Sequence, residues 1–276
     1  MYEPAKSPKR LYLEITSRCN LVCPFCLRPN RAQEDMPLVL IEKVLQESQT
    51  VSDYLYLHVQ GEPLLHRQFA EVLQLTDRYR RQVQLVTNGI LLEDYQDVLL
   101  ASTSLRKISV SMQGLFLASD LNNKLQVLAD FVERAKGHEL YIELRVWTAK
   151  KSEIIDYIQA SFNDGAVLVA NAKIKDNLYL SCKTEFEWPT LDLALNSKRR
   201  HCLGPKLMIC VLSDGTITPC CLDAQGLISL GNIRETTLEE ALVSSRYLRM
   251  SEGFKDNKAV ENLCKHCYYL SGYEEA

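Results

Sequence analysis

Residues 11–26 read LYLEITSRCNLVCPFC, a run in which an alternating apolar pattern leads into three closely spaced cysteines. The alternation has the period of a half-buried β-strand. The cysteines, in the spacing CxxxCxxC, are Cys19, Cys23 and Cys26. Short spacers let one loop place three thiolates around a metal centre, and soft thiolates select iron–sulfur clusters, zinc or copper over hard cations. The run therefore predicts a thiolate-bound metal centre at the carboxyl end of a first strand.

Strands and helices are expected to alternate over the following residues. Apolar alternation predicts strands at 54–59, 83–86, 108–112 and 140–147, and apolar residues at helical spacing predict helices near 41–48, 69–73, 92–100 and 125–132. Another helix is expected to begin with Ser152 as its N-cap. Strand starts separated by roughly 25 to 45 residues leave room for a helical crossover each time. The expected fold is α/β, with a parallel sheet that forms a full or partial β/α barrel and functional groups at the carboxyl ends of its strands.

The pattern weakens between residues 160 and 200, where a sixth strand at 167–169 and another at 178–180 are expected. Beyond it, two short apolar runs flank Ser213-Asp214-Gly215, which predicts a β-hairpin. A capping box is then expected, with Thr236 or Thr237 as the cap and Glu239 or Glu240 three residues later. We expect two domains, a barrel at residues 1–180 and a small hairpin-plus-helix module at 181–276.

Composition narrows the range of partners and compartments. The 276 residues are 46% hydrophobic and carry 32 Lys+Arg against 35 Asp+Glu, so a nucleic-acid partner is not expected. Two basic clusters, at Arg78, Arg80 and Arg81 and at 198–200, are interpreted as solvated surface. The amino terminus is polar and no run of about 18 apolar residues occurs, which predicts a cytoplasmic protein with no membrane partner. In a reducing cytosol, ten cysteines favour metal or redox chemistry over disulfides.

Three thiolate ligands allow two interpretations: a zinc site completed by a distant residue, or a four-iron cluster with one iron open to substrate. Here the sequence resembles the radical S-adenosylmethionine enzymes, whose motif is CxxxCxφC with an aromatic residue at φ, here Phe25. The resemblance implies a partial (β/α)6 barrel. It also implies that the three cysteines bind three irons of a [4Fe–4S] cluster while S-adenosylmethionine chelates the fourth, with Phe25 near the adenine. Reduction of the cluster would then give a 5′-deoxyadenosyl radical that abstracts a hydrogen atom.

The same family has a Gly-Gly-Glu-Pro-like turn after its second strand. Here Gln60-Gly61-Glu62-Pro63 follows the predicted strand, with the first glycine of that pattern replaced by Gln60. The resemblance implies that Gly61 and Glu62 form the turn that binds the methionine ammonium group, with Glu62 supplying a charge-assisted contact.

Three further positions are compared with the family pattern. Ser111 ends the strand at 108–112 and matches a hydroxyl that meets the ribose, although Gln113 stands where an Asp is frequent. The guanidinium of Arg145 suits the methionine carboxylate, and a salt bridge to Glu143 or a place on the sheet face is its alternative role. Asn88 is another ribose candidate, although a turn-forming Asn-Gly explains it better.

Six of the ten cysteines lie within about a quarter of the chain, between Cys202 and Cys267. Cys202, then Gly215 and Cys220, and later Cys264-Lys265-His266-Cys267, resemble the SPASM and twitch extensions that carry auxiliary iron–sulfur clusters. The chain ends at Ala276, before the further cysteines of a full SPASM domain, so we expect one auxiliary [4Fe–4S] cluster. Its expected ligands are Cys202, Cys220, Cys264 and Cys267, with a structural zinc site as the alternative.

The remaining cysteines receive different interpretations. Cys210 lies in an apolar strand pattern and is expected to be a buried small hydrophobe, whereas Cys221 is either a replacement ligand or a thiol near the cluster. Cys182 has no partner at useful spacing and is expected to be a buried thiol.

The resemblance implies a radical S-adenosylmethionine enzyme that abstracts a hydrogen atom from a peptide or a small metabolite, with the auxiliary cluster in electron transfer. An external one-electron reductant such as flavodoxin or ferredoxin is the expected partner. The alternative hypothesis is a non-enzymatic adaptor whose two cysteine-rich sites bind zinc.

Overall fold

The computed structural model describes residues 8–28, 30–149, 151–162, 168–196 and 201–269. Its backbone contacts divide the chain into two compact units. The first unit comprises Met1–Arg18, Cys26–Gly61 and Phe186–Ala276, and the second comprises Cys19–Phe25 and Glu62–Glu185. Each unit thus combines segments that are distant in sequence. The expected division into domains at 1–180 and 181–276 stays a prediction.

The first unit contains four neighbouring strands in the order β2-β1-β8-β9. β1 (Arg10–Leu13) is parallel to both β2 (Tyr54–Leu57) and β8 (Met208–Val211), and β8 forms an antiparallel pair with β9 (Ile217–Thr218). The helices of this unit are α1 (Leu38–Glu47), α7 (Gly204–Leu207), α8 (Leu238–Leu242), α9 (Ser245–Lys255) and α10 (Asn262–Lys265). The predicted hairpin is confirmed, and its first strand extends the sheet that begins with β1.

Local sequence explains these elements. Leu11 and Leu13 are fully buried on one face of β1, as the alternation predicted. The capping box is confirmed at α8, where the Thr237 side chain accepts a hydrogen bond from the Glu240 backbone and the Glu240 carboxylate accepts one from the Thr237 backbone. Such a box satisfies two backbone donors that the first helical turn leaves without partners.

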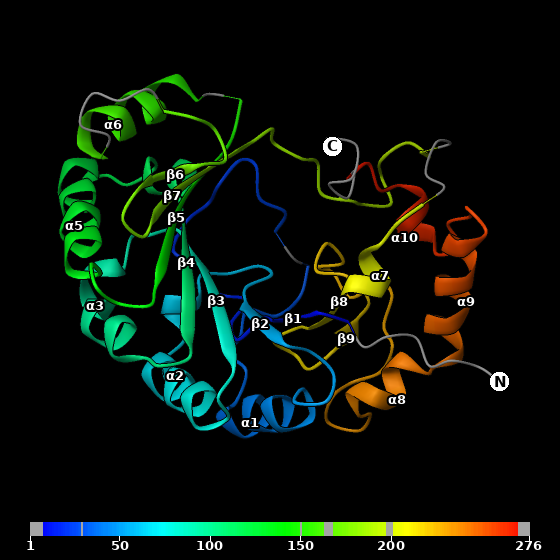
Figure 1. Cartoon of the computed structure of the whole chain (residues 1–276). Helices are drawn as coiled ribbons and strands as arrows, with labels where there is room; N and C mark the ends of the chain where they lie inside the picture. Colours follow the sequence, from blue (N-terminus) through cyan, green and yellow to red (C-terminus); the bar gives the residue numbers. More distant parts are fainter. Residues whose placement is uncertain (1–7, 29, 150, 163–167, 197–200, 270–276) are drawn as a thin grey trace. The chain divides into compact units, whose positions relative to one another are not determined.

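The second unit contains the strands β3-β4-β5-β7-β6 in that order. The parallel strands β3 (Gln82–Thr87), β4 (Leu105–Ser111), β5 (Tyr141–Trp147) and β7 (Leu178–Lys183) are followed by the antiparallel edge strand β6 (Lys173–Lys175). The helices are η1 (Pro63–Leu65), α2 (Phe69–Arg78), α3 (Leu92–Ala101), α4 (Met112–Leu115), α5 (Leu121–Arg134) and α6 (Ser152–Phe162). In Figure 1 the helices α2, α3, α5 and α6 lie along one side of these strands. The predicted alternation of parallel strands and crossover helices is confirmed.

Several local predictions are wrong. Leu168 and Val169 lie outside any strand, Val167 lies outside the described residues, and the strand after α6 is the antiparallel β6. Ser152 is the first residue of α6 and therefore not its N-cap. Apolar residues in a short run do not distinguish a strand from a loop that contacts the core, and helix boundaries are uncertain by a residue or two from sequence.

The basic cluster between α2 and β3 is only partly solvated. Arg78 and Arg80 are exposed, but Arg81 is 7% exposed, because the left-handed backbone of Arg80 (φ 50°) turns the chain just before β3. The second cluster, at 198–200, lies outside the described residues. No helix in the described ranges is both long and apolar enough to cross a membrane.

Candidate functional site

The first two cysteines of the CxxxCxxC loop belong to the second unit, next to the end of β3. The Asn88 side chain donates a 2.7 Å hydrogen bond to Asn20 Oδ1, and its Nδ2 lies 4.0 Å from Cys19 Sγ. Cys19 is exposed and Cys23 is half-buried, as is Phe25. Asn88 thus positions the start of the cysteine loop, a contact that its interpretation as a turn residue did not include.

The electrostatics of the two thiols fit a metal centre. Burial, followed by the charge of Cys19, raises the pKa of Cys23 to about 11, and partial desolvation of its sulfur raises the pKa of Cys19 although that residue is exposed as a whole. Neighbouring thiols of this kind resist double deprotonation unless a cation compensates the charge, and a bound metal supplies that compensation. The donor set therefore fits an iron–sulfur cluster.

Glu62 lies at the turn that precedes η1. Its side chain is buried, and it accepts hydrogen bonds from Leu64 N at 3.1 Å, Thr87 Oγ1 at 2.7 Å and Asn88 N at 2.6 Å. Burial raises the pKa of Glu62 to about 7 even though all three donors oppose that shift. The bonds from Thr87 and Asn88 hold the turn against the end of β3, and the bond from Leu64 caps η1. The contact of Glu62 with a methionine ammonium group stays a prediction.

Gly61 is required by its backbone surroundings in the first unit. Its φ is +76°, and a Cβ at this position would lie 2.4 Å from the Thr16 carbonyl oxygen and 2.9 Å from the Arg18 carbonyl oxygen. Only glycine combines this φ with such a close approach to backbone. The turn therefore packs directly on the chain that leads into the cysteine loop.

Ser111 and Arg145 are register partners at the carboxyl ends of β4 and β5. The guanidinium carbon of Arg145 lies 3.6 Å from the centre of the Trp147 ring, a cation–π contact that fixes its plane. Glu143, considered as a partner for Arg145, accepts hydrogen bonds from Lys107 Nζ at 2.7 Å and Ser109 Oγ at 2.6 Å. The Ser111 hydroxyl and the Arg145 guanidinium, which packs on Trp147, thus lie at the carboxyl ends of these strands, where functional groups were expected.

The second cysteine cluster lies in the first unit, where Cys202 and Cys220 converge on Gly204. A Cβ on Gly204 would lie 3.2 Å from Cys202 Sγ and 3.8 Å from Cys220 Sγ. The Gly204 N–H donates to Cys202 Sγ at 3.3 Å, and the Leu222 N–H donates to Cys220 Sγ at 3.4 Å. Backbone donors aimed at sulfur stabilise thiolate ligands, so this pair fits the expected auxiliary cluster.

Cys264 lies in α10 and Cys267 directly follows its C-cap, His266, and Asn196 binds the backbone of this segment. The Asn196 backbone N–H donates to the Lys265 carbonyl at 2.7 Å, and its side chain donates to the Cys267 carbonyl at 2.9 Å. Within the described part of the chain, no three Cys, His, Asp or Glu side chains already stand in the closed arrangement of a metal site. The assignment of four thiolates to one cluster therefore stays a prediction.

The other cysteines lie in distinct surroundings. Cys210 is fully buried on β8 in a cluster with Tyr12 and Leu212, as expected of a small hydrophobe. Cys221 packs against that cluster, with its Sγ 3.7 Å from Met208 Sδ. The expectation for Cys182 is wrong, because its side chain is half-buried. It lies on β7 beyond the residues that pair with β6, where the strand is less covered.

Sequence reasoning missed the pair Glu14 and Arg31. Glu14 is fully buried, and both its carboxylate oxygens accept hydrogen bonds from Arg31 Nη2, at 3.0 and 2.8 Å. It also accepts from Gln60 N at 3.1 Å and Ser213 N at 2.9 Å. Burial raises the pKa of Glu14, and the Arg31 charge opposes that shift. The available signal was a glutamate within an apolar strand, next to the end where function was expected.

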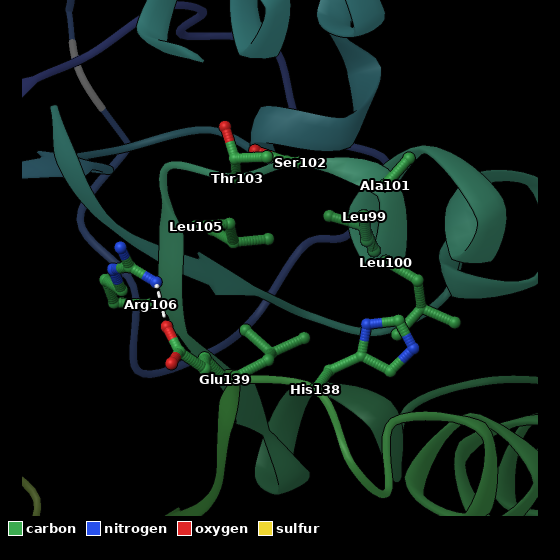
Figure 2. A pocket seen from close by; sticks show the side chains of 10 residues that line it. Leu99, Leu100, Ala101, Ser102, Thr103, Leu105, Arg106, His138 and Glu139 are labelled. Atoms are coloured by element: carbon green, nitrogen blue, oxygen red, sulfur yellow. Dashed lines mark hydrogen bonds and ion pairs between the residues drawn. The ribbon is translucent and has the colours of Figure 1, made fainter. Parts of the chain in front are cut away.

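A cavity of about 350 Å³ lies at the opposite ends of the second unit's strands. It is lined by residues at the start of β4 and before β5, and Figure 2 shows Arg106 and Glu139 facing each other beside it, in an ion pair of 3.1 Å. Because these are the amino ends of parallel strands, the cavity is not where catalytic groups of such a fold are found.

Comparison with known protein families gives two matches. Residues 13–148 match the model of the Radical SAM superfamily, and residues 202–268 match SPASM, described as an iron-sulfur cluster-binding domain. The two matched regions contain the two cysteine clusters.

Individual curated relatives match part of the chain. The chain is 28% identical over 183 residues to the tungsten-containing aldehyde ferredoxin oxidoreductase cofactor-modifying protein of Pyrococcus furiosus, covering 59% of this chain and 51% of that protein. The chain spans about half the length of the curated relatives it matches.

Solved structures share the fold at low identity. BtrN in complex with AdoMet and 2-DOIA matches with a TM-score of 0.59 and 16% identity, covering 96% of this chain and 94% of that one. Streptococcus suis SuiB bound to precursor peptide SuiA matches with a TM-score of 0.62 and 15% identity, covering 95% and 71%. The mixed α/β fold with a parallel sheet and a C-terminal hairpin module is the one these structures share with this chain.

Proposed function

Because the chain belongs to the radical SAM superfamily and carries a C-terminal SPASM iron–sulfur domain, we propose that it cleaves S-adenosylmethionine reductively and abstracts a hydrogen atom from an organic substrate. The cofactors of these regions are a [4Fe–4S] cluster with S-adenosylmethionine and an auxiliary iron–sulfur cluster. When bound, the first cluster would supply the electron that splits the sulfonium, and the 5′-deoxyadenosyl radical so released would abstract the hydrogen atom.

The observation that carries this proposal is the match of residues 13–148, which contain the loop of Cys19, Cys23 and Cys26, to the Radical SAM superfamily. Three thiols on one short loop are suited to a shared metal centre. Around them, Arg145 binds the methionine carboxylate, Ser111 meets the ribose, and Phe25 packs near the adenine. The turn of Gly61 and Glu62 receives the methionine ammonium group.

The auxiliary cluster is proposed to be a [4Fe–4S] cluster whose ligands are Cys202, Cys220, Cys264 and Cys267. The backbone donors at Gly204 and Leu222 support the first two of these ligands. With four thiolates, its irons are closed to substrate, which favours electron transfer. The zinc-binding adaptor is set aside, because both cysteine clusters fall within regions that match iron–sulfur and radical SAM families.

The substrate is proposed to be a peptide or a small metabolite. SuiB holds a precursor peptide and BtrN holds 2-DOIA, and both have the fold of this chain. An external one-electron reductant such as flavodoxin or ferredoxin is proposed to supply the electron. A cytoplasmic location is proposed, because thiolate-bound iron–sulfur clusters suit a reducing compartment.

The test is an anaerobic purification followed by iron and sulfide analysis and electron paramagnetic resonance (EPR), with and without S-adenosylmethionine. The wild type is compared with a variant in which all three cysteines of the first loop are changed to Ala. We expect about eight irons in the wild type and about four in the variant, and one EPR signal that S-adenosylmethionine shifts only in the wild type.

Two other outcomes change the proposal. About four irons in the wild type and none in the variant would leave the first cluster in place and assign zinc to the C-terminal site. A protein that holds zinc but takes up no iron after reconstitution would overturn the enzyme and support the adaptor.

A further inference from the structure

The side chain of Gln60 touches a proposed iron ligand. Gln60 is 4% exposed, and its Oε1 lies 3.0 Å from Cys26 Sγ. Its Nε2 is buried without a hydrogen-bond partner. A buried amide nitrogen rarely lacks a hydrogen-bond partner, because no hydrogen bond then offsets the free-energy cost of removing it from water. The proposed radical chemistry does not explain this residue.

The orientation of the amide depends on the state of the sulfur. When Cys26 carries its proton, the S–H group donates to the amide oxygen. An iron-bound thiolate has no proton and only accepts hydrogen bonds, so it prefers the amide nitrogen. Rotation of the amide by 180° about its last bond exchanges Oε1 and Nε2 at almost no change in shape. The same rotation gives the amide N–H group an acceptor, the Cys26 sulfur, and places the amide oxygen where the nitrogen was.

The backbone holds Gln60 firmly in this place. Its N–H donates to Glu14 Oε1 at 3.1 Å, and Glu14 is itself held by Arg31. The next residue, Gly61, approaches the Thr16 carbonyl too closely for any side chain. The main chain of the turn is therefore fixed on both sides, and the Gln60 side chain has a defined reach towards Cys26.

We propose that Gln60 is a positioning residue of the first cluster, whose amide donates an N–H···S hydrogen bond to the Cys26 thiolate and raises the reduction potential of the cluster. The inference rests on the proposed function. An added electron increases the negative charge on the cluster and its sulfur ligands, and a donor aimed at one sulfur stabilises that charge. One electron from the external reductant is then accepted at a less negative potential, with no other bond made or broken.

The experiment is a redox titration of the holoenzyme, monitored by the EPR signal that S-adenosylmethionine shifts. Gln60→Leu removes the amide at similar size, and Gln60→Glu replaces the donor by an acceptor. We expect the midpoint potential to become more negative in Gln60→Leu and still more negative in Gln60→Glu. A tenfold fall in the ratio of reduced to oxidised cluster corresponds to about 59 mV for a one-electron couple.

The matched control is Gln96→Leu. Gln96 is also a buried glutamine, at 9% exposure, but its Oε1 accepts a hydrogen bond from Arg134 on the neighbouring helix α5. This variant should leave the midpoint potential unchanged. A wild-type potential in both Gln60 variants, with full iron content, would overturn the role of Gln60 and leave the proposed function standing.

A second measurement uses the wild type and therefore does not depend on the folding of a variant. In wild-type enzyme labelled with ¹⁵N at glutamine side chains, the reduced first cluster should show a magnetic coupling to one amide nitrogen. Absence of this coupling would contradict the hydrogen bond. Failure of the proposed function is recognised differently, because the wild type would then hold no cluster that responds to S-adenosylmethionine.

Discussion

Arg31 Nη2 lies 2.8 Å from one carboxylate oxygen of Glu14 and 3.0 Å from the other, and both side chains are almost completely buried. Glu14 follows β1, Arg31 follows the cysteine loop, and the same carboxylate binds the backbone of Gln60 and Ser213. One buried ion pair thus joins the first strand, the turn and the C-terminal hairpin within the first unit.

Removal of Arg31 should destabilise the fold strongly. In Arg31→Met the Glu14 carboxylate remains buried without its counter-charge, and we expect a loss of about 3–5 kcal/mol in the free energy of unfolding. Urea denaturation measures it. Lys43→Met removes the more exposed helical pair with Glu47 and should cost about 0.5 kcal/mol or less. Equal losses of unfolding free energy in the two variants would show that the buried pair stabilises the fold no more than the exposed pair does.

Gly61→Ala should destabilise more than Gly137→Ala. Both glycines have positive φ, +76° and +83°, so in each variant the left-handed backbone of the new alanine should lower the free energy of unfolding by about 1–2 kcal/mol. Only at Gly61 does the new Cβ also meet backbone, 2.4 Å from the Thr16 carbonyl oxygen, whereas nothing lies within 4 Å at Gly137. Thermal unfolding compares the two, and a smaller effect at Gly61 would contradict the packing of this turn.

The free energy of unfolding of the cluster-free protein should fall as the pH rises from about 4.5 to 7, because Glu62 loses its proton more readily in the unfolded chain. Burial raises its folded pKa from 4.5 to about 7, so in this window the unfolded chain releases the proton that the folded chain keeps. The expected loss is on the order of 3 kcal/mol. Across this window the free energy of unfolding of the wild type should fall relative to that of Glu62→Gln, whose side chain does not titrate, and urea denaturation at several pH values measures the change.

Arg145→Met should weaken the binding of S-adenosylmethionine without affecting iron content. Loss of a hydrogen bond between charged groups costs about 1.5–3 kcal/mol, or about 10- to 100-fold in Kd. Arg145→Lys should bind with intermediate affinity, because lysine keeps the charge and loses the planar fork. Equilibrium binding to the reconstituted enzyme provides the measurement. Arg106→Met, at the amino end of β4, should bind as the wild type does.

Cys220→Ala should lose the auxiliary iron, whereas Cys221→Ser should keep it. The Sγ of Cys220 lies with Cys202 Sγ beside Gly204, whereas Cys221, which hydrogen-bonds with Cys220, has its Sγ 3.7 Å from Met208 Sδ. We expect about four irons in the first variant and about eight in the second. Loss of iron from Cys221→Ser alone would exchange the roles of the two cysteines.

Local patterns in the sequence determined most of the strands and helices and the two cysteine clusters. The period-2 runs that became β1 to β5, the capping box at Thr237 and the hairpin around Gly215 all depend on residues a few positions apart. The spacing of Cys19, Cys23 and Cys26 is likewise local, because one short loop carries all three. Such features follow from backbone geometry and solvation, which act over short stretches of chain.

Tertiary structure alone decided the partners of these elements. The pairing of β8 with β1, the burial of Glu14 with Arg31 and the approach of Gln60 to Cys26 each join residues that are far apart in sequence. No local periodicity encodes them, because a strand edge or a buried charge is satisfied by any complementary group that packing brings near. The sequence by itself determined which residues are suited to the chemistry, and folding decided which of them meet.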